Sequence, residues 1–353
     1  MMKTRVLYMI GLMACMALSF MSCAGREPQT VCFFGSSVCR GVGADSLNGY
    51  ASLVRQNFPE GWEYINISVD GNNTFDLFAR LEKDFAGLDV QYVVLGISLG
   101  NEGLHEVGER AVLSYRENMP RLIRMLQDKG YYVIVVNNYT RGDFNEVDYQ
   151  DLCTVNLEVQ QWDVTTINVC GTLDNGKGRW AEGYWNGQDI YHPNQRGHEA
   201  MASAFPPSLW EALQEGKKLP EFVSTEGDDN GVHRLSFVPE PGLQSYTLSY
   251  ESNDTVFTQV YAAAQSRKSF YVNGSLHKQL DGYSESISSF VVNGTNLHQP
   301  FFYRAAMTPI EVEALAQGKF LRSSLELYCP LLQADVTNYA QTTNGIVANE
   351  QNK

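Results

Sequence analysis

Three residues of this chain have the types and the setting that hydrolysis by a serine nucleophile requires. Ser37 stands in the stretch FFGSSVCRGVG, where an apolar, strand-like run meets a Gly-Ser turn. A serine hydroxyl is a poor nucleophile at neutral pH, so it needs a base within hydrogen-bond reach and a group that orients the base. His192 has the most suitable context of the six histidines, because Asp189 precedes it by three residues in DIYHPNQRGHEAMASAF. On a turn, this spacing can place the carboxylate against one imidazole nitrogen and leave the other nitrogen facing a cleft.

A serine mechanism also needs hydrogen-bond donors for the oxyanion that forms on the attacked carbonyl. Gly71 in SVDGNNT offers a backbone N–H group, and Asn101 in SLGNEG offers a side-chain amide. Taken singly, each of these segments is also typical of a plain turn or helix cap. Their joint placement favours chemistry, because the serine, glycine and asparagine each follow a strand-like run.

The elements that must position these residues alternate along the first part of the chain. Strand-like runs are separated by segments with apolar residues at helical spacing, and these runs are TVCFFG, WEYINIS, VQYVVLGIS, YYVIVVNNY and TTINVCG. Such alternation predicts a parallel sheet covered by helices on both faces. In sheets of this kind the ligand crevice lies at the carboxyl ends of the strands, which is where the candidate residues fall.

The character of the sequence changes near residue 214. We expect an α/β domain over residues 28–213 and a polar linker over 214–231. Short alternating runs separated by Asn-Gly turns then predict an antiparallel β-sandwich over 232–335. Residues 336–353 are expected to form a frayed polar tail.

The first residues are typical of a secretory signal rather than of the fold. Lys3 and Arg5 precede an apolar run that ends in MSCAG, so residues 1–22 are interpreted as a signal peptide. The small residue Ser22 before Cys23 resembles a bacterial lipoprotein cleavage site, which would make Cys23 a lipidated N-terminus and the protein's membrane anchor. The expected location is then the periplasm, the outer membrane or the cell surface, with plain secretion as the alternative.

Charge and cysteine content narrow the function classes further. The 353 residues carry 40 acidic and 26 basic side chains, which argues against nucleic acid as a partner. Five cysteines follow Cys23, and their spacings match no metal motif. A disulfide between Cys153 and Cys170 is conceivable, and Cys32 is expected to be a small buried hydrophobe.

The four segments, taken in order, resemble the SGNH hydrolases, also called the GDSL esterases. GSSVCRGVG fits the Gly-Asp-Ser-x-x-x-Gly block of that family with Ser36 in the place of the aspartate, and the resemblance covers roughly residues 30–213. The asparagine block departs from the family pattern Gly-x-Asn-Asp, because Leu99 stands in the place of the glycine and Glu102 replaces the aspartate. The resemblance implies a flavodoxin-like three-layer α/β/α fold and a Ser-His-Asp acyl-enzyme mechanism with no metal or cofactor. By its register the nucleophile is Ser37, the base and its orienting acid are His192 and Asp189, and the oxyanion donors are Ser37, Gly71 and Asn101.

The closing stretch FFYRAAMTPIEVEALAQGKF, followed by SSLELYCPL, is similar to the end of laminin-G-like or concanavalin-like sandwiches. Together these resemblances favour a secreted serine esterase that removes short acyl groups, acetyl above all, from carbohydrates or other small esters. The aromatic stretch GRWAEGYWNG could offer sugar rings a stacking surface or pack against the sheet. A lipid acylhydrolase or lysophospholipase is the alternative enzyme, and a non-catalytic glycan-binding surface lipoprotein is the alternative outside the enzymes. His198 is expected to be a partly exposed helical histidine, with a loose metal cluster of Asp189, His192 and His198 as the alternative.

Overall fold

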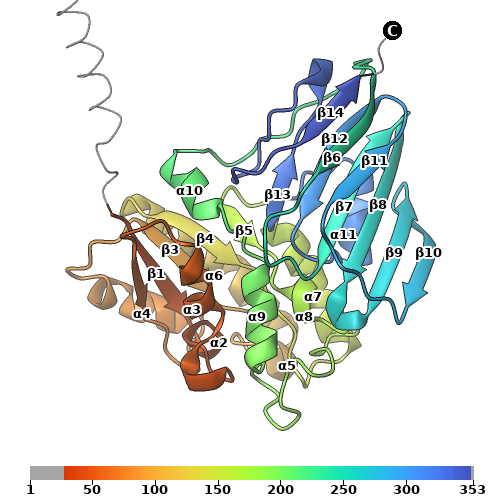
Figure 1. Cartoon of the computed structure of the whole chain (residues 1–353). Helices are drawn as coiled ribbons and strands as arrows, with labels where there is room; N and C mark the ends of the chain where they lie inside the picture. Colours follow the sequence, from red (N-terminus) through yellow and green to blue (C-terminus); the bar gives the residue numbers. More distant parts are fainter. Residues whose placement is uncertain (1–27, 351–353) are drawn as a thin grey trace, which may run out of the picture.

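The computed structural model describes residues 28–350, so the predicted signal peptide and Cys23 lie outside the described residues. The first part of the fold is a five-stranded parallel sheet in the order β2-β1-β3-β4-β5 (Figure 1). Its strands are β1 (Thr30–Gly35), β2 (Glu63–Asn66), β3 (Tyr92–Gly96), β4 (Tyr132–Val136) and β5 (Thr165–Ile167). The chain passes from one side of β1 to the other after β2, which places the topological switch point at the carboxyl ends of β1 and β3.

Helices cover both faces of this sheet, which makes the first part a three-layer α/β/α structure. One face packs against α4 (Thr74–Asp84), α6 (Glu109–Asp128) and α7 (Glu146–Val159). The other face packs against α3 (Tyr50–Val54), α9 (Gln195–Ser203) and α10 (Leu209–Gln214). The short helices are α2 (Ser37–Arg40), α5 (Leu104–Val107) and α8 (Cys170–Leu173), with 3₁₀ turns η1 (Asp45–Leu47) and η2 (Arg55–Asn57).

The strand residues explain why both faces are covered. Along β1, Val31 and Phe33 belong to the apolar cluster on the α3 and α9 face, whereas Cys32 and Phe34 belong to the cluster on the opposite face. Successive strand side chains point to opposite faces, so a continuous apolar run needs a helix layer on each side. The α/β fold class predicted from the sequence is confirmed.

The second part consists of two antiparallel sheets that enclose a shared apolar cluster. The six-stranded sheet has the order β10-β9-β8-β7-β12-β13, and the three-stranded sheet has the order β11-β6-β14. The elements are β6 (Val232–Phe237), β7 (Tyr246–Ser252), β8 (Thr255–Ala262), η3 (Ala263–Gln265), β9 (Arg267–Val272), β10 (Ser275–Asp281), β11 (Phe290–Asn293), β12 (Leu297–Tyr303), α11 (Pro309–Ala316), β13 (Leu325–Tyr328), η4 (Leu332–Ala334) and β14 (Val347–Glu350). The predicted antiparallel sandwich is therefore present.

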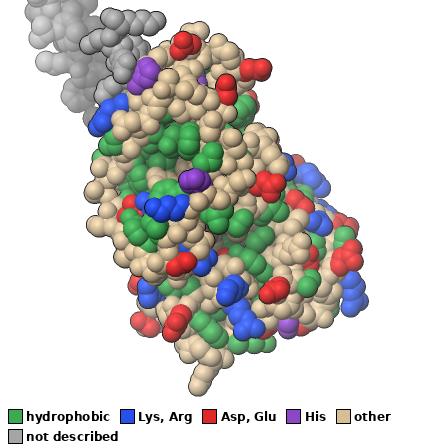
Figure 2. Space-filling model, turned by 90° about the vertical axis from the view of Figure 1, so that its right-hand side faces the viewer, with side chains coloured by type: hydrophobic (Ala, Val, Ile, Leu, Met, Phe, Trp, Pro, Cys, Tyr) green, Lys and Arg blue, Asp and Glu red, His purple; other side chains and the backbone are tan. Residues whose placement is uncertain are grey.

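The smaller sheet does not cover the whole of the larger one. A hollow of about 530 Å³ remains beside β11, and its lining includes the aromatic side chains Tyr250, Phe257 and Phe270. Figure 2 shows hydrophobic side chains gathered in a hollow on this side of the molecule. Much of the aromatic alternation along these strands nevertheless serves the core, because Tyr246 and Tyr261 are buried in the cluster between the sheets.

Residues 336–350 of the segment expected to be a frayed polar tail are instead part of the fold, so the sequence prediction is wrong for them. Strand β14 pairs with β6, and residues 338, 340, 341 and 342 are buried. The segment is held by polar side chains: the Asn338 amide donates to the backbone oxygens of Glu326 and Asn344. Because hydrogen bonds rather than an apolar pattern secure this segment, its polar composition was misleading.

The two parts of the fold are joined at the edge of the parallel sheet. Strand β5 lies at that edge, and the backbone N–H of Ser324 donates to the carbonyl oxygen of Thr166 at 3.0 Å. The Ser324 hydroxyl in turn accepts the backbone N–H of Asn168 at 2.8 Å. A segment of the second part thus covers an edge that would otherwise present unpaired backbone groups. Residues 215–231, which connect the two parts, form no helix or strand.

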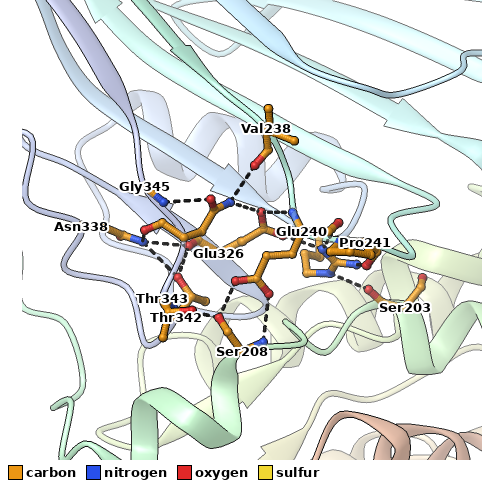
Figure 3. A network of polar contacts seen from close by, with 12 residues as sticks. Ser203, Ser208, Val238, Glu240, Pro241, Glu326, Asn338, Thr342, Thr343 and Gly345 are labelled. Atoms are coloured by element: carbon orange, nitrogen blue, oxygen red, sulfur yellow. Dashed lines mark hydrogen bonds and ion pairs between the residues drawn. The ribbon is translucent and has the colours of Figure 1, made fainter.

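A buried ion pair lies beside this junction. Arg304 and Glu326 are 1% and 0% exposed and are joined at 2.5 Å. Arg304 Nε also donates to the carbonyl oxygen of Ser203, the last residue of α9, at 2.8 Å. Figure 3 shows the surrounding network, in which Glu240 accepts the backbone N–H of Ser208. The second part therefore holds the carboxyl end of the helix that follows His192 in the chain.

The described part of the chain contains neither the disulfide considered from the sequence nor a membrane-spanning helix. Cys32, Cys39, Cys153, Cys170 and Cys329 are all buried free thiols, so the conceivable bridge between Cys153 and Cys170 is absent. Cys32 is a buried strand residue, as expected. Within residues 28–350 no helix has both the length and the apolar character needed to cross a membrane.

Breaking the buried ion pair should destabilise the whole protein. Arg304→Met leaves the Glu326 carboxylate buried without its partner, which typically costs about 3 to 5 kcal/mol and should lower Tm by roughly 10 °C. The double variant Arg304→Met with Glu326→Leu should recover much of this loss. Thermal unfolding monitored by circular dichroism measures both, with Arg267→Met, in the exposed pair with Asp281, as the near-neutral control. Equal Tm values for the single and double variants would contradict the role given to the ion pair.

Candidate active site

The serine turn is built by close packing at the end of β1. Gly35 is the last residue of β1, and a Cβ atom there would collide with the carbonyl oxygen of Gly96 on β3. Ser36 caps α2 and Ser37 begins it, and α2 ends at Gly41 in the left-handed conformation with φ of 102°. Only glycine adopts that conformation without strain, so the short helix stops after one turn. The result is a serine hydroxyl presented at the carboxyl edge of the sheet.

Ser37, His192 and Asp189 are joined by hydrogen bonds. His192 Nε2 lies 2.9 Å from Ser37 Oγ, and His192 Nδ1 lies 2.7 Å from Asp189 Oδ2. Asp189 is itself held, because its other oxygen accepts the backbone N–H of Tyr191 at 3.0 Å. With its proton on Nδ1, the imidazole offers the Nε2 lone pair to the serine hydroxyl, as a general base must. The structure thus brings together the three residues that the sequence indicated.

The loop after Ser37 is docked directly onto the segment after His192. A Cβ atom at Gly43 would collide with the carbonyl oxygen of Pro193, so the two backbones touch there. His198 on α9 strengthens the contact: its Nδ1 accepts the backbone N–H of Tyr50 at 3.2 Å, and its Nε2–H donates to the Val42 carbonyl at 2.9 Å. The serine and the histidine are therefore held together by a buried connection behind them.

His198 differs from its sequence prediction. It is fully buried rather than partly exposed, because α9 packs against α3 and the ring lies beside Tyr50 at 6.2 Å between ring centroids. Burial lowers the pKa of His198 to about 4 from its ordinary value of 6.5. Both of its nitrogens are occupied by backbone groups, which leaves neither for the loose metal cluster considered above. Within residues 28–350 no group of three or more histidine, cysteine, aspartate or glutamate side chains is arranged to hold a metal ion.

The expected oxyanion donors line the same cavity as the nucleophile. The cavity has a volume of about 310 Å³, and Ser37, Gly71, Asn101 and His192 all contribute to its wall. Gly71 follows β2 with φ of 73°, a conformation that favours glycine. The Asn101 amide Nδ2 donates to Ser36 Oγ at 2.9 Å. Ser36, which takes the place of the family aspartate, therefore holds the side chain expected to bind the oxyanion.

The loop that carries Asn101 is fixed despite its departures from the family pattern. The Asn101 side-chain oxygen accepts the backbone N–H of Ser98 at 3.2 Å. Leu99, which occupies the position of the missing glycine, donates its backbone N–H to Asn138 Oδ1 at 2.8 Å. Glu102, in place of aspartate, accepts the backbone N–H of Thr74 at the start of α4 at 2.8 Å. Arg141 Nη1 donates to the carbonyl oxygen of Gly100 at 2.7 Å. These contacts give the loop a defined shape, which its sequence left open.

Sequence reasoning missed Arg141, Tyr139 and Tyr191, which also line the cavity. A usable signal was present, because the polar and aromatic stretch NNYTRGD directly follows the fourth strand and so had to reach the same sheet edge. His105 lies elsewhere: its Nδ1 is 2.7 Å from Asp148 Oδ2, and it does not line the cavity.

The aromatic stretch before Asp189 supports the sheet layer rather than the cleft. Trp180 and Tyr184 are buried in the cluster beneath the sheet, and Trp180 stacks on Tyr139 at 5.8 Å between ring centroids. Of the two interpretations of GRWAEGYWNG, packing is the one that the structure supports for these two rings.

Residues 33–200 match the model of the GDSL-like lipase/acylhydrolase family, in agreement with the resemblance seen in the sequence. A search of curated proteins found no match. Among solved structures, the chain is similar to a protein assigned to the G-D-S-L lipolytic family from Desulfitobacterium hafniense, with 13% identity over 50% of this chain and 97% of the other, at a TM-score of 0.42. It is also similar to an acetylxylan esterase from Geobacillus stearothermophilus, with 15% identity over 51% and 94% of the chains and a TM-score of 0.41. A third similar structure is an alpha/beta hydrolase from the metagenome of Lake Arreo, with 22% identity over 50% and 92% and a TM-score of 0.38.

Loss of the Ser36 hydroxyl should weaken catalysis without removing the nucleophile. In Ser36→Ala the Asn101 amide loses its acceptor, so we expect kcat to fall by about tenfold with little change in KM. Asn101→Ala removes the donor itself and should lower kcat by about a hundredfold. Ser36→Asp restores an acceptor at this position and should recover part of the rate. Steady-state kinetics on p-nitrophenyl acetate measures this, with the exposed Ser286→Ala as control. An unchanged kcat in Ser36→Ala would contradict the positioning role.

The buried His198 should make stability fall in acid. The pKa of His198 is about 4 in the folded protein and 6.5 in the unfolded chain. Between pH 4 and pH 6.5 this imidazole therefore binds a proton in the unfolded chain but not in the folded protein. The contribution of neutral His198 to stability is therefore present above pH 6.5 and is lost as the pH falls towards 4, by about 3 kcal/mol at most. Urea unfolding of wild type and His198→Gln at pH 7 and pH 4 should show the difference between them shrinking at low pH. Parallel pH dependence in the two proteins would show that His198 does not titrate in this way.

Proposed function

We propose that the protein is a serine esterase that hydrolyses short acyl esters, acetyl esters above all, of carbohydrates. The observation that carries this proposal is the hydrogen-bonded set of Ser37, His192 and Asp189 in a cavity whose wall also includes Gly71 and Asn101, the two further groups expected to bind the oxyanion. The match of residues 33–200 to the model of an acylhydrolase family supports the reaction class.

The reaction follows from the geometry. His192 Nε2 takes the hydroxyl proton as Ser37 Oγ bonds to the ester carbonyl carbon, and Asp189 stabilises the imidazolium that forms. The carbonyl oxygen becomes an oxyanion held by the backbone N–H groups of Ser37 and Gly71 and by the Asn101 amide. The tetrahedral intermediate collapses, the bond to the alcohol breaks, and His192 returns its proton to the leaving oxygen. Water, deprotonated by His192, then attacks the acyl carbon. The bond to Ser37 Oγ breaks, His192 returns the proton to that oxygen, and the acid is released.

The cavity wall favours a small acyl group over a long lipid chain. Its lining consists mostly of glycine and polar side chains, and its apolar members are Val38, Tyr139 and Tyr191. A long acyl chain would need a contiguous apolar surface, since about 0.8 kcal/mol of binding comes from each buried methylene. The short acyl group is part of the proposal on this ground.

The proposed setting of the enzyme is outside the cytoplasm. The N-terminal pattern supports export, with lipidation at Cys23 as the membrane anchor and the periplasm, outer membrane or cell surface as the location. These residues precede the described part of the chain. Mass spectrometry of Cys23 in the membrane fraction would test the anchor.

Hydrolysis of p-nitrophenyl acetate compared with the octanoate ester tests the proposed reaction. For a soluble chain that begins after Cys23, we expect a preference for acetate and a loss of about 10⁴-fold or more in kcat for Ser37→Ala, because nothing else in the site can replace the nucleophile. Ser286→Ala, at an exposed serine, is the matched control.

Each other outcome identifies a competing function. A preference for octanoate with the same dependence on Ser37 would indicate the lipid acylhydrolase. Activity that survives in Ser37→Ala would exclude the serine mechanism. An inert wild type that binds glycans would indicate the non-catalytic glycan-binding protein.

A further inference from the structure

Tyr191 is an unusual residue in the wall of the catalytic cavity. It stands between Asp189 and His192 in the chain, lines the cavity, and is 50% exposed. Large aromatic side chains usually bury most of their surface, so an aromatic ring left open beside a nucleophile needs a reason. The other aromatic residue of the wall, Tyr139, is 4% exposed and is covered by Trp180.

The ring of Tyr191 rests on a fixed support. The guanidinium carbon of Arg141 lies 4.7 Å from the ring centroid, within the range of a cation–π contact. Arg141 is itself held by ion pairs: its side chain is 7% exposed and is paired with Asp143 at 2.5 Å and Glu106 at 3.1 Å. The Tyr191 backbone is held by its N–H bond to Asp189. One face of the ring is therefore supported from below, and little rotamer freedom remains to be lost when a ligand covers the other face.

The ring also stands where the alcohol part of an ester must pass. Its centroid is 6.4 Å from that of His192, with the two planes at 69°. His192 is the group that returns a proton to the leaving oxygen, so the atoms attached to that oxygen lie beside the imidazole and hence beside Tyr191. The acyl part lies on the other side, towards the oxyanion donors Gly71 and Asn101.

We propose that Tyr191, supported by Arg141, is the platform on which a sugar ring of the leaving alcohol stacks, and that it determines the preference of the enzyme for acetylated carbohydrates. A pyranose ring presents a face of C–H groups that packs on an aromatic face, while its hydroxyl groups stay solvated. The proposal rests on the esterase function proposed above and assigns the recognition of the alcohol to one side chain. Tyr191 is thus a specificity residue, whereas Arg141 acts through it as a positioning residue.

The test compares two acetate esters that differ only in the alcohol. Acetylated xylo-oligosaccharides offer a sugar ring, and ethyl acetate offers none, with acid release followed by pH-stat for both. The readout is the ratio of kcat/KM for the sugar acetate to kcat/KM for ethyl acetate. The variants are Tyr191→Phe, which keeps the ring, and Tyr191→Leu, which keeps apolar bulk without it. The control is Tyr339→Leu, at an exposed tyrosine of the second part.

We expect Tyr191→Leu to lower the ratio by about tenfold, mainly through KM for the sugar acetate, while Tyr191→Phe and Tyr339→Leu keep the wild-type ratio. The platform is overturned if Tyr191→Leu keeps the wild-type ratio or lowers kcat/KM equally for both substrates. It is also overturned if Tyr191→Phe lowers the ratio as much as Tyr191→Leu, because that result would assign the effect to the tyrosine hydroxyl rather than to the ring. If wild type cleaves ethyl acetate through Ser37 and yet shows no effect at Tyr191, the platform fails and the esterase stands. If wild type cleaves neither ester, the esterase itself falls and the platform falls with it.

Discussion

The position of Ser37 next to His192 depends on contact between two backbones that are far apart in the chain. The serine and histidine are 155 residues apart in sequence, and they meet because the loop after α2 touches the segment after His192. At Gly43 there is no room for a side chain. Behind this contact, His198 forms hydrogen bonds with the backbone of Val42 and of Tyr50, on either side of Gly43 in the chain. The separation of Ser37 Oγ and His192 Nε2 is therefore set by groups outside the hydrogen-bonded set of Ser37, His192 and Asp189. Such support is what holds a catalytic pair in its productive geometry.

The polar groups around the cavity are likewise held by contacts between loops that are far apart in the chain. The loop that carries Asn101 is fixed from three directions, by Ser36, by Arg141 and by the start of α4 through Glu102. Arg141 serves two of the strand-end loops at once, because it bonds to Gly100 and supports the ring of Tyr191. A site with so many shared contacts has few independent parts. The loop of Asn101 and the ring of Tyr191 are positioned together through Arg141.

Much of the fold was predictable because it follows from local patterns. The alternation of apolar strand runs with helical spacing determined the parallel sheet, and the rule for strand ends placed Ser37, Gly71 and Asn101 at one edge. What could not be predicted depends on which loops meet across that edge. The bond from Asn101 to Ser36 joins residues 65 positions apart, and no pattern in either segment indicates it.

Burial without an apolar signal was equally hidden from the sequence. His198 is a polar residue on an amphipathic helix, and only the packing of α9 on α3 shows that it is enclosed. The segment around Asn338 is polar as well, yet its side chains satisfy the backbone of β13 and make the segment part of the core. Hydropathy patterns detect apolar burial and overlook burial secured by hydrogen bonds.

Because the second part of the chain covers the edge of strand β5, it has a structural role in the first part of the fold. A binding module attached by a linker can be exchanged or lost while the enzyme persists, but here Ser324 continues the hydrogen bonding of the catalytic sheet and Arg304 ends one of its helices. The two parts are therefore joined by hydrogen bonds other than the chain connection through residues 215–231. The sandwich thus acts as a structural cover for the parallel sheet, and a substitution at this junction would disturb the first part of the fold as well as the second.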